Sequence, residues 1–267
     1  MLSRLRRGLL TSVAAMGGFS PLSLFAASEP GFWFDPSDLS TLFQDAAGTT
    51  PVTAAGQSVG LVLDKSGRGN HATQSTSLSR PTYQIDSNGR GYLSFDGSDD
   101  FLVTPTITPG TDKAQVFAGV RKLSDAVIGF LAELSSAASA NAGSWAVRAP
   151  NSAGVGNYGF NTRGSAGVVS PSALGYNAPI TNVLTCIGDI AADTAIIRVN
   201  GVQAASDAAD QGTGNYLAYP IHIGRRNGTT LPFNGRIYSL ICRFGSNLTA
   251  DQIAQTEAWV NARTGAY

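Results

Sequence analysis

Charged residues are scarce in this sequence. Only 13% of its 267 residues are Asp, Glu, Lys or Arg, and 18 basic residues balance 18 acidic ones. A chain without a basic excess has no strong field to attract phosphate or anionic lipid, so neither nucleic acid nor a membrane is an expected partner. Its surface must instead consist of Ser, Thr, Asn and Gly, which is typical of secreted proteins, fibres and capsid components.

Cysteine and histidine are equally rare. Cys186 and Cys242 each lie in an apolar, strand-like run, which favours two buried thiols over a disulfide bridge. His71 and His222 lack the spacing that would complete a zinc site with them. We therefore expect no metal and no cofactor.

The sequence also lacks the carboxylate pair that a glycosidase needs. Its three glutamates, Glu29, Glu133 and Glu257, lie far apart in the chain. Asp99 and Asp100 are adjacent, so on a strand they would face opposite sides. No nucleophile elbow accompanies either histidine, and no phosphate-binding loop is present. We therefore predict a protein that is not an enzyme, with no catalytic residues.

What the sequence has in abundance is turn residues between short apolar runs. Hydrophobic residues make up 43% of the chain, which also contains 31 glycines and 12 prolines. Many short strands separated by turns favour an all-β sandwich or jelly roll. The expected strands cover residues 32–34, 59–63, 91–95, 101–103, 115–120, 127–134, 144–149, 158–161, 183–190, 195–199, 221–224 and 236–244.

Several polar residues and glycines are expected to shape turns rather than to bind a ligand. Asp and Asn side chains bond nearby backbone amides, and glycine adopts positive φ without strain. These structural turn residues are Asp64, Gly67, Gly69, Asp96, Gly97, Asn200, Gly201, Asn234 and Gly235.

A single helix is expected at the C-terminal end. Thr249 and Gln252 have the spacing of a capping box, in which each side chain bonds the backbone of the other residue. Apolar side chains recur at helical spacing as far as Val260, and Gly265 can end the helix.

The N-terminal residues allow two interpretations. Arg4, Arg6 and Arg7 precede an uncharged stretch, as in a signal peptide. Glycine, proline and serine interrupt that stretch, which disfavours a membrane helix, and bulky Phe25 fits poorly beside a cleavage site after Ala27. We favour an anchoring arm over residues 1–28, and the cleaved signal peptide remains the alternative.

Three motifs resemble concanavalin A-like, laminin-G-like domains. They are D-x-S-G-x-G-N at 64–70, L-x-F-D-G-x-x-D at 93–100, and F-x-G-x-I at 233–237 followed by L-T-x-x-Q-I at 248–253. The resemblance implies a concanavalin A-like jelly-roll sandwich over residues 59–267, with one C-terminal α-helix. Residues 29–58 would then be a linker that contains an aromatic strand and turns, and residues 1–28 the N-terminal arm.

The N-terminal region resembles the start of bacteriophage and prophage proteins. The residues concerned are R-R-G-L-L at 6–10, S-L-F-A at 23–26 and W-x-D-P-S-D-L-x-T-L-F-Q-D at 33–45. The resemblance implies a virion protein, tail-associated as a fibre, tip or baseplate component, which contacts other virion proteins through the arm. It also implies a homo-oligomer, for which trimers are common. The alternatives are a capsid decoration protein and a secreted or periplasmic lectin-like module.

Such folds often bind calcium and glycans. Asp96, Asp99 and Asp100 offer oxygen ligands, but no EF-hand spacing accompanies them, and a calcium-free turn is favoured. A cell-surface glycan would contact exposed aromatic rings and nearby amides. The candidate ligand-binding residues are Trp145, Asn157, Tyr158, Asn161 and Tyr216.

Overall fold

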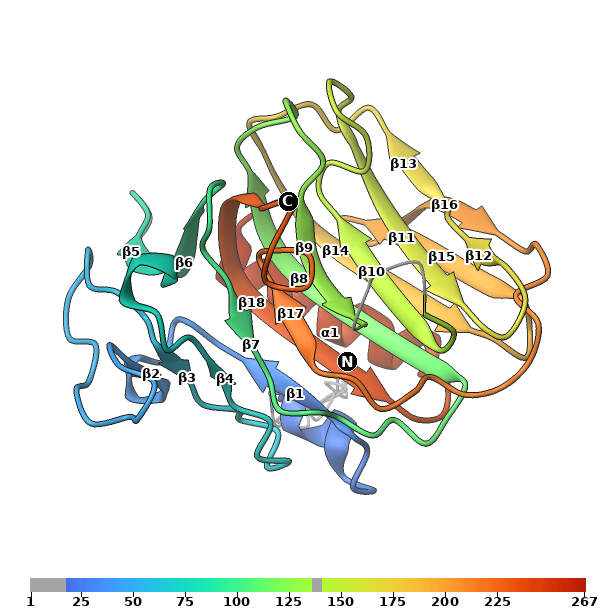
Figure 1. Cartoon of the computed structure of the whole chain (residues 1–267), viewed down its shortest axis with the longest axis horizontal. Helices are drawn as coiled ribbons and strands as arrows, with labels where there is room; N and C mark the ends of the chain where they lie inside the picture. The colour runs from blue at the N-terminus through green and yellow to red at the C-terminus, as the bar shows by residue number, and fades with distance from the viewer. Residues whose placement is uncertain (1–17, 136–140) are drawn as a thin grey trace, which may run out of the picture.

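A computed structural model describes residues 18–135 and 141–267 of the chain. It consists of two antiparallel sheets packed face to face, with one helix on the outside (Figure 1). Sheet A has eight strands, which are β1 (Gly31–Phe34), β5 (Thr82–Ile85), β6 (Gly91–Asp96), β8 (Lys113–Lys122), β14 (Ile180–Asp189), β15 (Thr194–Val199), β16 (Val202–Asp207) and β18 (Asn234–Phe244).

Sheet B has ten strands, several of them short. They are β2 (Leu42–Phe43), β3 (Leu61–Val62), β4 (Ala72–Thr73), β7 (Leu102–Val103), β9 (Phe130–Leu134), β10 (Ser144–Arg148), β11 (Asn157–Arg163), β12 (Val168–Val169), β13 (Ser172–Leu174) and β17 (Ile221–Ile223). Three 3₁₀ turns complete the described elements, namely η1 (Pro21–Phe25), η2 (Leu39–Thr41) and η3 (Ser77–Ser79), with the helix α1 (Ala250–Thr264). The chain is thus an all-β jelly-roll sandwich with one C-terminal α-helix, as the sequence predicts.

The long strand β8 lies at the centre of sheet A, where the order is β16-β15-β14-β8-β18-β6-β5 and β1 also pairs with β18. Val116 of β8 lies opposite Cys186 of β14 on one side and Cys242 of β18 on the other. Two strand spacings, about 10 Å, therefore separate the cysteines, which is too far for a disulfide. Both thiols are free and buried, and burial raises the pKa of each.

The main core fills the space between the two sheets. The alternate residues Ala114, Val116, Ala118 and Val120 of β8 all belong to it, because side chains on a strand alternate between its faces. The intervening Phe117 belongs to a second apolar cluster, on the outer face of sheet A. Both faces of β8 are therefore buried, and the strand is apolar without interruption from Val116 to Val120.

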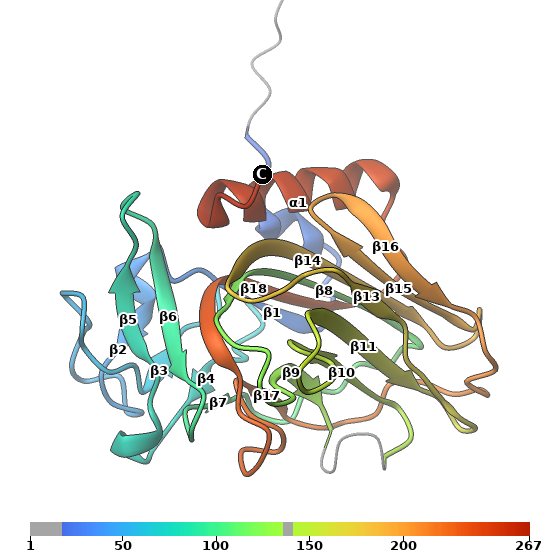
Figure 2. The same ribbon diagram turned by 90° about the horizontal axis from the view of Figure 1, so that it is seen from above.

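The helix α1 covers this outer face of sheet A (Figure 2). Thr249 and Gln252 form the predicted capping box, and Gly265 ends the helix with a left-handed φ of 63°. The second cluster joins the helix, the sheet and the N-terminal segment through Leu24, Phe25, Trp33, Phe117, Val183, Ile241 and Val260.

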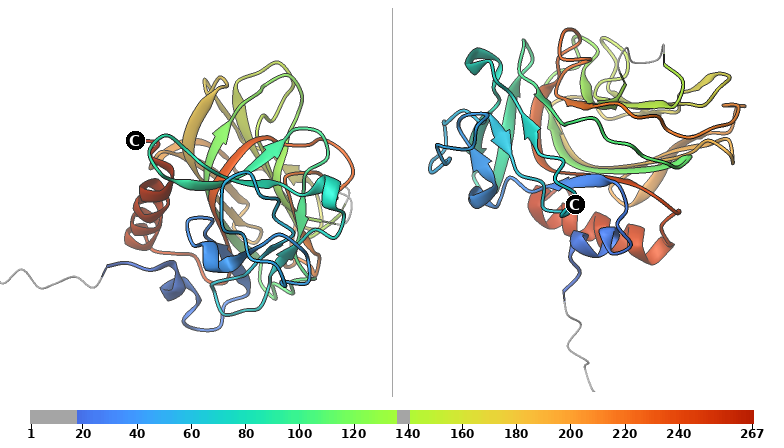
Figure 3. Two further views of the ribbon diagram at one scale, coloured as in Figure 1. Left: turned by 90° about the vertical axis from the view of Figure 1, so that its left-hand side faces the viewer. Right: turned by 60° about the horizontal axis from the view of Figure 1, so that its bottom comes forward.

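The first described residues are part of the sandwich. Leu24 and Phe25 of η1 are buried against sheet A beside α1 (Figure 3). Residues 29–58, expected as a linker, instead contribute β1 to sheet A and β2 to sheet B, because their aromatic and apolar side chains complete the core. Of the predicted arm, residues 1–17 lie outside the described residues. Within the described residues, no helix has the length and apolarity needed to span a membrane.

Candidate functional site

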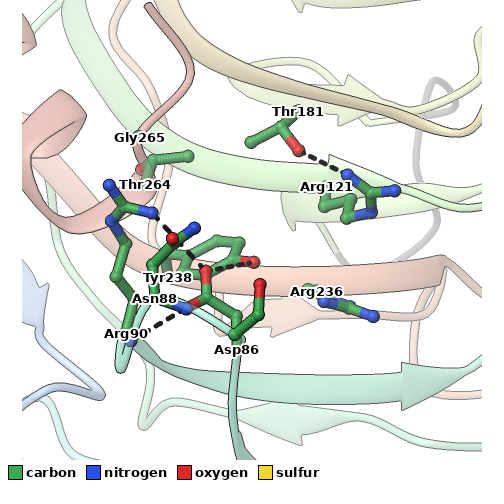
Figure 4. Close-up of a pocket in the computed structure, with 10 residues that line it drawn as sticks. Asp86, Asn88, Arg90, Arg121, Thr181, Arg236, Tyr238, Thr264 and Gly265 are labelled. Atoms are coloured by element: carbon green, nitrogen blue, oxygen red, sulfur yellow. Dashed lines mark hydrogen bonds and ion pairs between the residues drawn. The ribbon is translucent and has the colours of Figure 1, made fainter.

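A row of polar side chains crosses the outer face of sheet A beyond the end of α1. Arg121 of β8 is the register partner of Arg236 on β18 and of Thr181 on β14. These three side chains face the same side of the sheet, because directly opposed residues on neighbouring strands share a face. The turn between β5 and β6 borders the row, and it brings Asp86, Asn88 and Arg90 close to it (Figure 4).

Together these residues line a cavity of about 290 Å³, here called the arginine pocket. Its walls are mostly polar and come from the β5–β6 turn, β8, β14, β18 and the C-terminal end of α1. The lining residues are Asp86, Ser87, Asn88, Arg90, Arg121, Thr181, Arg236, Tyr238, Thr264 and Gly265.

The pocket has more positive than negative charge. Three arginines and one aspartate line it, which leaves two positive charges in a chain whose total charge is zero. Arg90 is paired with Asp86 at 3.7 Å. Within the two described ranges, neither Arg121 nor Arg236 has a carboxylate within ion-pair distance.

Neighbouring groups hold the two arginines in place. Arg121 donates a hydrogen bond of 3.0 Å from Nη1 to the hydroxyl of Thr181, and its buried Nε has no hydrogen-bond acceptor among the described residues. The guanidinium of Arg236 lies 4.7 Å from the ring centre of Tyr92. Burial raises the pKa of Tyr238, while the nearby Arg236 opposes that rise. The site therefore consists of two positioned guanidinium groups beside polar side chains.

The residues predicted to contact a glycan lie elsewhere and do not form a surface site. Trp145, Tyr158 and Tyr216 are each only 1% exposed and belong to the main core. The hydroxyl of Tyr158 donates to Asn182, and that of Tyr216 shares a 2.6 Å hydrogen bond with Thr162. The structure corrects the expectation for these rings, because a ring enclosed in the core cannot stack on a sugar.

The two predicted asparagines also have structural partners. The Oδ1 of Asn157 accepts hydrogen bonds from the backbone N–H groups of Asn151 and Ser152. The Oδ1 of Asn161 accepts hydrogen bonds from Arg148 and from the hydroxyl of Ser170. Neither amide oxygen is left to bind a ligand.

Asp64 organises the glycine-rich loop. Its Oδ1 accepts hydrogen bonds from the backbone N–H groups of Trp33 at 2.9 Å and Ser66 at 2.8 Å, and its Oδ2 accepts one from Asn70 at 3.1 Å. Gly67 and Gly69 have φ values of 80° and 73°, which the loop requires of glycine. The loop motif thus fastens the N-terminal strand β1 to the sandwich.

Of the remaining predicted turn residues, two lie in a turn, whereas Asn234 and Gly235 are strand residues of β18 and form no turn. Asn200 and Gly201, both at positive φ, form the tight turn between β15 and β16. Gly235 follows Asn234 at the start of β18, where a Cβ atom would lie 2.5 Å from the carbonyl oxygen of Arg121. Glycine at that position lets β18 approach β8 closely.

Acidic residues of the β6–β7 turn form hydrogen bonds with the backbone of the same turn. Asp96, Asp99 and Asp100 place carboxylate oxygens within 4.8 Å of one another. The carboxylate of Asp96 accepts a hydrogen bond from the backbone N–H of Ser98, next to Gly97 with its positive φ. The carboxylate of Asp99 accepts one from the hydroxyl of Ser79, and that of Asp100 accepts one from the backbone N–H of Asp96. These hydrogen bonds give each of the three carboxylates a partner within the described residues.

The three glutamates are engaged in separate contacts. Glu29 pairs with Arg243 at 2.9 Å, and Glu257 pairs with Arg198 at 2.7 Å. Glu133 of β9 accepts a hydrogen bond from the backbone N–H of Asn227, and burial raises its pKa to about 7. These contacts lie on different elements, so the glutamates do not combine into a carboxylate pair.

Sequence reasoning missed the arginine pocket because its members are far apart in the chain. The available signal was an arginine beside an apolar run, which is the case for Arg121 after residues 116–120 and for Arg236 before Ile237. Only the register of β8 against β18 brings the two together.

No family model and no curated protein sequence matches the chain. Solved structures do match it. The binding domain of botulinum neurotoxin serotype D has a TM-score of 0.57 at 12% identity, over 86% of this chain and 52% of the neurotoxin domain. The sandwich fold of this chain therefore also occurs in a solved structure.

Two further neurotoxin structures give similar values. One concerns botulinum neurotoxin type C, whose cell entry depends on interaction with two ganglioside molecules, with a TM-score of 0.56 at 11% identity over 87% of this chain and 51% of the other. The other is the serotype D ligand-binding domain in complex with N-acetylneuraminic acid, with a TM-score of 0.55 at 13% identity over 74% and 48%. The chain spans about half the length of these domains, and at such identities the likeness shows the fold alone. None of the three is a phage protein.

Proposed function

We propose that this chain is a non-enzymatic carbohydrate-binding domain and that the arginine pocket is its binding site. The observation that carries the proposal is the lining of the pocket, where guanidinium, amide and hydroxyl groups converge beside Tyr238 on a rigid sheet. Small-molecule sites fix the orientation of their ligands through a few precisely placed polar groups of this kind. The neurotoxin neighbours described with gangliosides and N-acetylneuraminic acid support the same class of ligand.

The state of the carboxylates supports a function without catalysis. A glycosidase needs two carboxyl groups facing one bond of the substrate. In this chain Glu29 and Glu257 are held in ion pairs, and Asp86 is paired with Arg90 and accepts the backbone N–H groups of Asn88 and Arg90. The pocket therefore has one carboxylate, and that carboxylate is already in use.

The proposal is tested by screening the full chain on a glycan array, with a variant that fills the pocket. The N88W substitution places a large ring at an exposed turn position while keeping the backbone bond from residue 88 to Asp86, which is 2.8 Å long. The S98W substitution is the matched control, because Ser98 bonds Asp96 at 2.8 Å in an equivalent turn outside the pocket. We expect the wild type and S98W to bind the same glycans and N88W to lose them. Binding that N88W leaves unchanged would refute the assignment of the site.

The virion role is a finer part of the same proposal. We propose, from the resemblance of residues 6–45 to phage proteins, that the domain belongs to a tail-associated virion component and attaches it to a host-surface glycan. The packing of Leu24 and Phe25 in the second cluster favours this over the secreted lectin, because cleavage after Ala27 would remove two core side chains.

Immunogold electron microscopy tests this assignment, with an antibody against residues 29–267 and phage particles from the source. Labelling at the tail supports it, and labelling over the head would indicate a capsid decoration protein instead. Free protein that begins at residue 28, with unlabelled particles, would identify the secreted alternative.

A further inference from the structure

Two arginines of the pocket lie at directly opposed positions of neighbouring strands, and neither has a carboxylate within ion-pair distance among the described residues. Arg121 and Arg236 are opposed on neighbouring strands, an arrangement in which like charges repel. Nine ion pairs of opposite charge are formed within the described residues, and neither Arg121 nor Arg236 belongs to any of them. A like-charged pair in a chain with so few charges therefore requires an explanation.

Other groups near the pocket do not neutralise this pair. Asp86 is already paired with Arg90 and accepts a hydrogen bond from Tyr238 at 3.5 Å. Arg90 also packs against Gly265, at the C-terminal end of α1, where the helix dipole is negative. The negative groups around the pocket thus compensate the positive charge of Arg90. The positive charges of Arg121 and Arg236 have no such compensation.

The free donors of the pair fit an oxygen anion. Guanidinium groups bind carboxylate and tetrahedral oxyanions through paired, charge-assisted hydrogen bonds. Nη1 of Arg121 is fixed by Thr181, and its Nη2 makes no hydrogen bond within the described part of the chain, whereas its Nε is buried and faces away from a ligand. Arg236 is held over the ring of Tyr92. Both groups are thus positioned before a ligand arrives, which reduces the entropy lost on binding.

The rest of the pocket fits sugar hydroxyls. Ser87 and Asn88 are exposed at its rim, and the hydroxyl of Thr181 lies beside Arg121. The volume of about 290 Å³ lies at the small end of the range for ligand sites, roughly 300–1,000 Å³. That size suits a single sugar ring.

On the basis of the proposed function, we infer that the bound sugar is acidic and that its carboxylate or sulfate group lies between Arg121 and Arg236. The anion removes the repulsion within the pair, and the hydroxyl groups of the ring contact the turn between β5 and β6. A neutral sugar in the same place would leave the two like charges uncompensated.

The experiment measures affinity by isothermal titration calorimetry with defined probes and the full chain. The probes are hexuronic and nonulosonic acid oligosaccharides, the methyl esters of the same oligosaccharides, neutral oligosaccharides carrying an O-sulfate, and inorganic sulfate. The variants are R121Q and R236Q, with R236K to preserve charge and R68Q as a control of equal charge change at an exposed site outside the pocket. Thermal unfolding of each variant without ligand checks that the fold is retained.

We expect an acidic probe to bind at least about tenfold more tightly than its neutral counterpart, because charge-assisted hydrogen bonds are lost with the charge. R121Q and R236Q should each weaken acidic binding about tenfold or more, R236K should weaken it less, and R68Q should leave it unchanged. Preference for the carboxylate over the sulfate probe, or the reverse, identifies the anionic group.

Two outcomes separate failure of the inference from failure of the proposed function. If esterified or neutral sugars bind as tightly as acidic ones and N88W abolishes that binding, the domain binds glycans but the acidic selectivity is refuted. If inorganic sulfate binds with dependence on Arg121 and Arg236 while no sugar binds, the anion site is real and the glycan function is refuted. Acidic binding that R121Q and R236Q do not change would overturn the inference directly.

Discussion

Arg198 of β15 and Glu257 of α1 form a bidentate ion pair. Nε of the arginine lies 2.7 Å from Oε1 of the glutamate, and Nη2 lies 3.1 Å from Oε2. The side chain of Glu257 is only 3% exposed, so its carboxylate has exchanged water for this one guanidinium. The hydrogen bond also raises the pKa of Arg198. The pair fastens the C-terminal helix to sheet A.

We predict that E257A destabilises the protein by roughly 3 kcal/mol, because it removes one member of a largely buried pair and leaves the other without its partner. Replacing both residues, in R198M/E257L, should restore a large part of that loss, since no unpaired charge remains. Urea unfolding followed by circular dichroism measures both effects. Q255A, at an exposed position of the same helix, should change the free energy of unfolding by less than about 0.5 kcal/mol. An E257A protein as stable as Q255A would contradict this account.

The fold was largely predictable because its signals are local. The capping box from Thr249 to Gln252 and the positive-φ turn at Asn200-Gly201 depend on neighbouring residues, and both occur as the sequence indicates. The status of residues 29–58 was not predictable in this way. Whether Phe32 and Phe34 belong to a linker or to the core depends on β1 pairing with β18, which is distant in the chain.

The candidate site was less predictable for the same reason. Trp145, Tyr158 and Tyr216 are aromatic residues in polar or glycine-rich stretches, and composition alone does not tell an exposed ring from a buried one. Their burial follows from the side of the strand that faces the opposite sheet. Arg121 and Arg236 become a site only when the register of β8 and β18 is known.

Asp64 offers a test of the structural interpretation of the glycine-rich loop. D64A removes the acceptor for the backbone N–H groups of Trp33, Ser66 and Asn70, of which the first two are buried residues and the third is half-buried. We expect a loss of roughly 3 kcal/mol in the free energy of unfolding, since each unsatisfied group costs about 1–3 kcal/mol. Glycan affinity of the folded fraction should stay at the wild-type value. A D64A protein of normal stability with lost affinity would make Asp64 a ligand contact instead.

Arg243 should control the docking of the N-terminal segment. Its guanidinium donates to the carbonyl oxygens of Leu24 at 2.8 Å and Ser246 at 2.7 Å, and to the side chains of Gln115 and Glu29, both at 2.9 Å. Lysine cannot reproduce this fork of donors. We predict that R243K loses about 2–3 kcal/mol of stability and exposes residues 18–28 to limited proteolysis.

The control for this prediction is R68K. Arg68 reaches the same segment through a single bond of 3.4 Å to the carbonyl oxygen of Phe25, and it is exposed. Cleavage sites read by mass spectrometry should therefore appear within the segment in R243K and not in R68K. Equal cleavage of the two variants would show that the apolar contacts of Leu24 and Phe25 hold the segment without Arg243.

The raised pKa of Glu133 makes the free energy of unfolding depend on pH. Burial raises its pKa from 4.5 to about 7, so the folded state keeps a proton that the unfolded state releases between these values. The contribution of Glu133 is therefore most favourable below pH 4.5 and is lost as the pH rises through 7, by at most about 3.5 kcal/mol at about 1.4 kcal/mol per pKa unit. Burial lowers the pKa of His222, the register partner of Glu133, and this works in the opposite direction, so only a comparison of variants isolates the glutamate.

The E133Q variant supplies that comparison, because glutamine keeps an acceptor for the backbone N–H of Asn227 and cannot ionise. We expect E133Q to equal the wild type at pH 5 and to exceed it at pH 8 by on the order of 2 kcal/mol, as measured by urea unfolding at both values. D251N, which neutralises an exposed carboxylate at the start of α1, should show no such gain between the two pH values. If the difference between E133Q and the wild type is the same at pH 5 and pH 8, Glu133 is not protonated in the folded protein and must be stabilised as a carboxylate, with the nearby Arg226 as the available counter-charge.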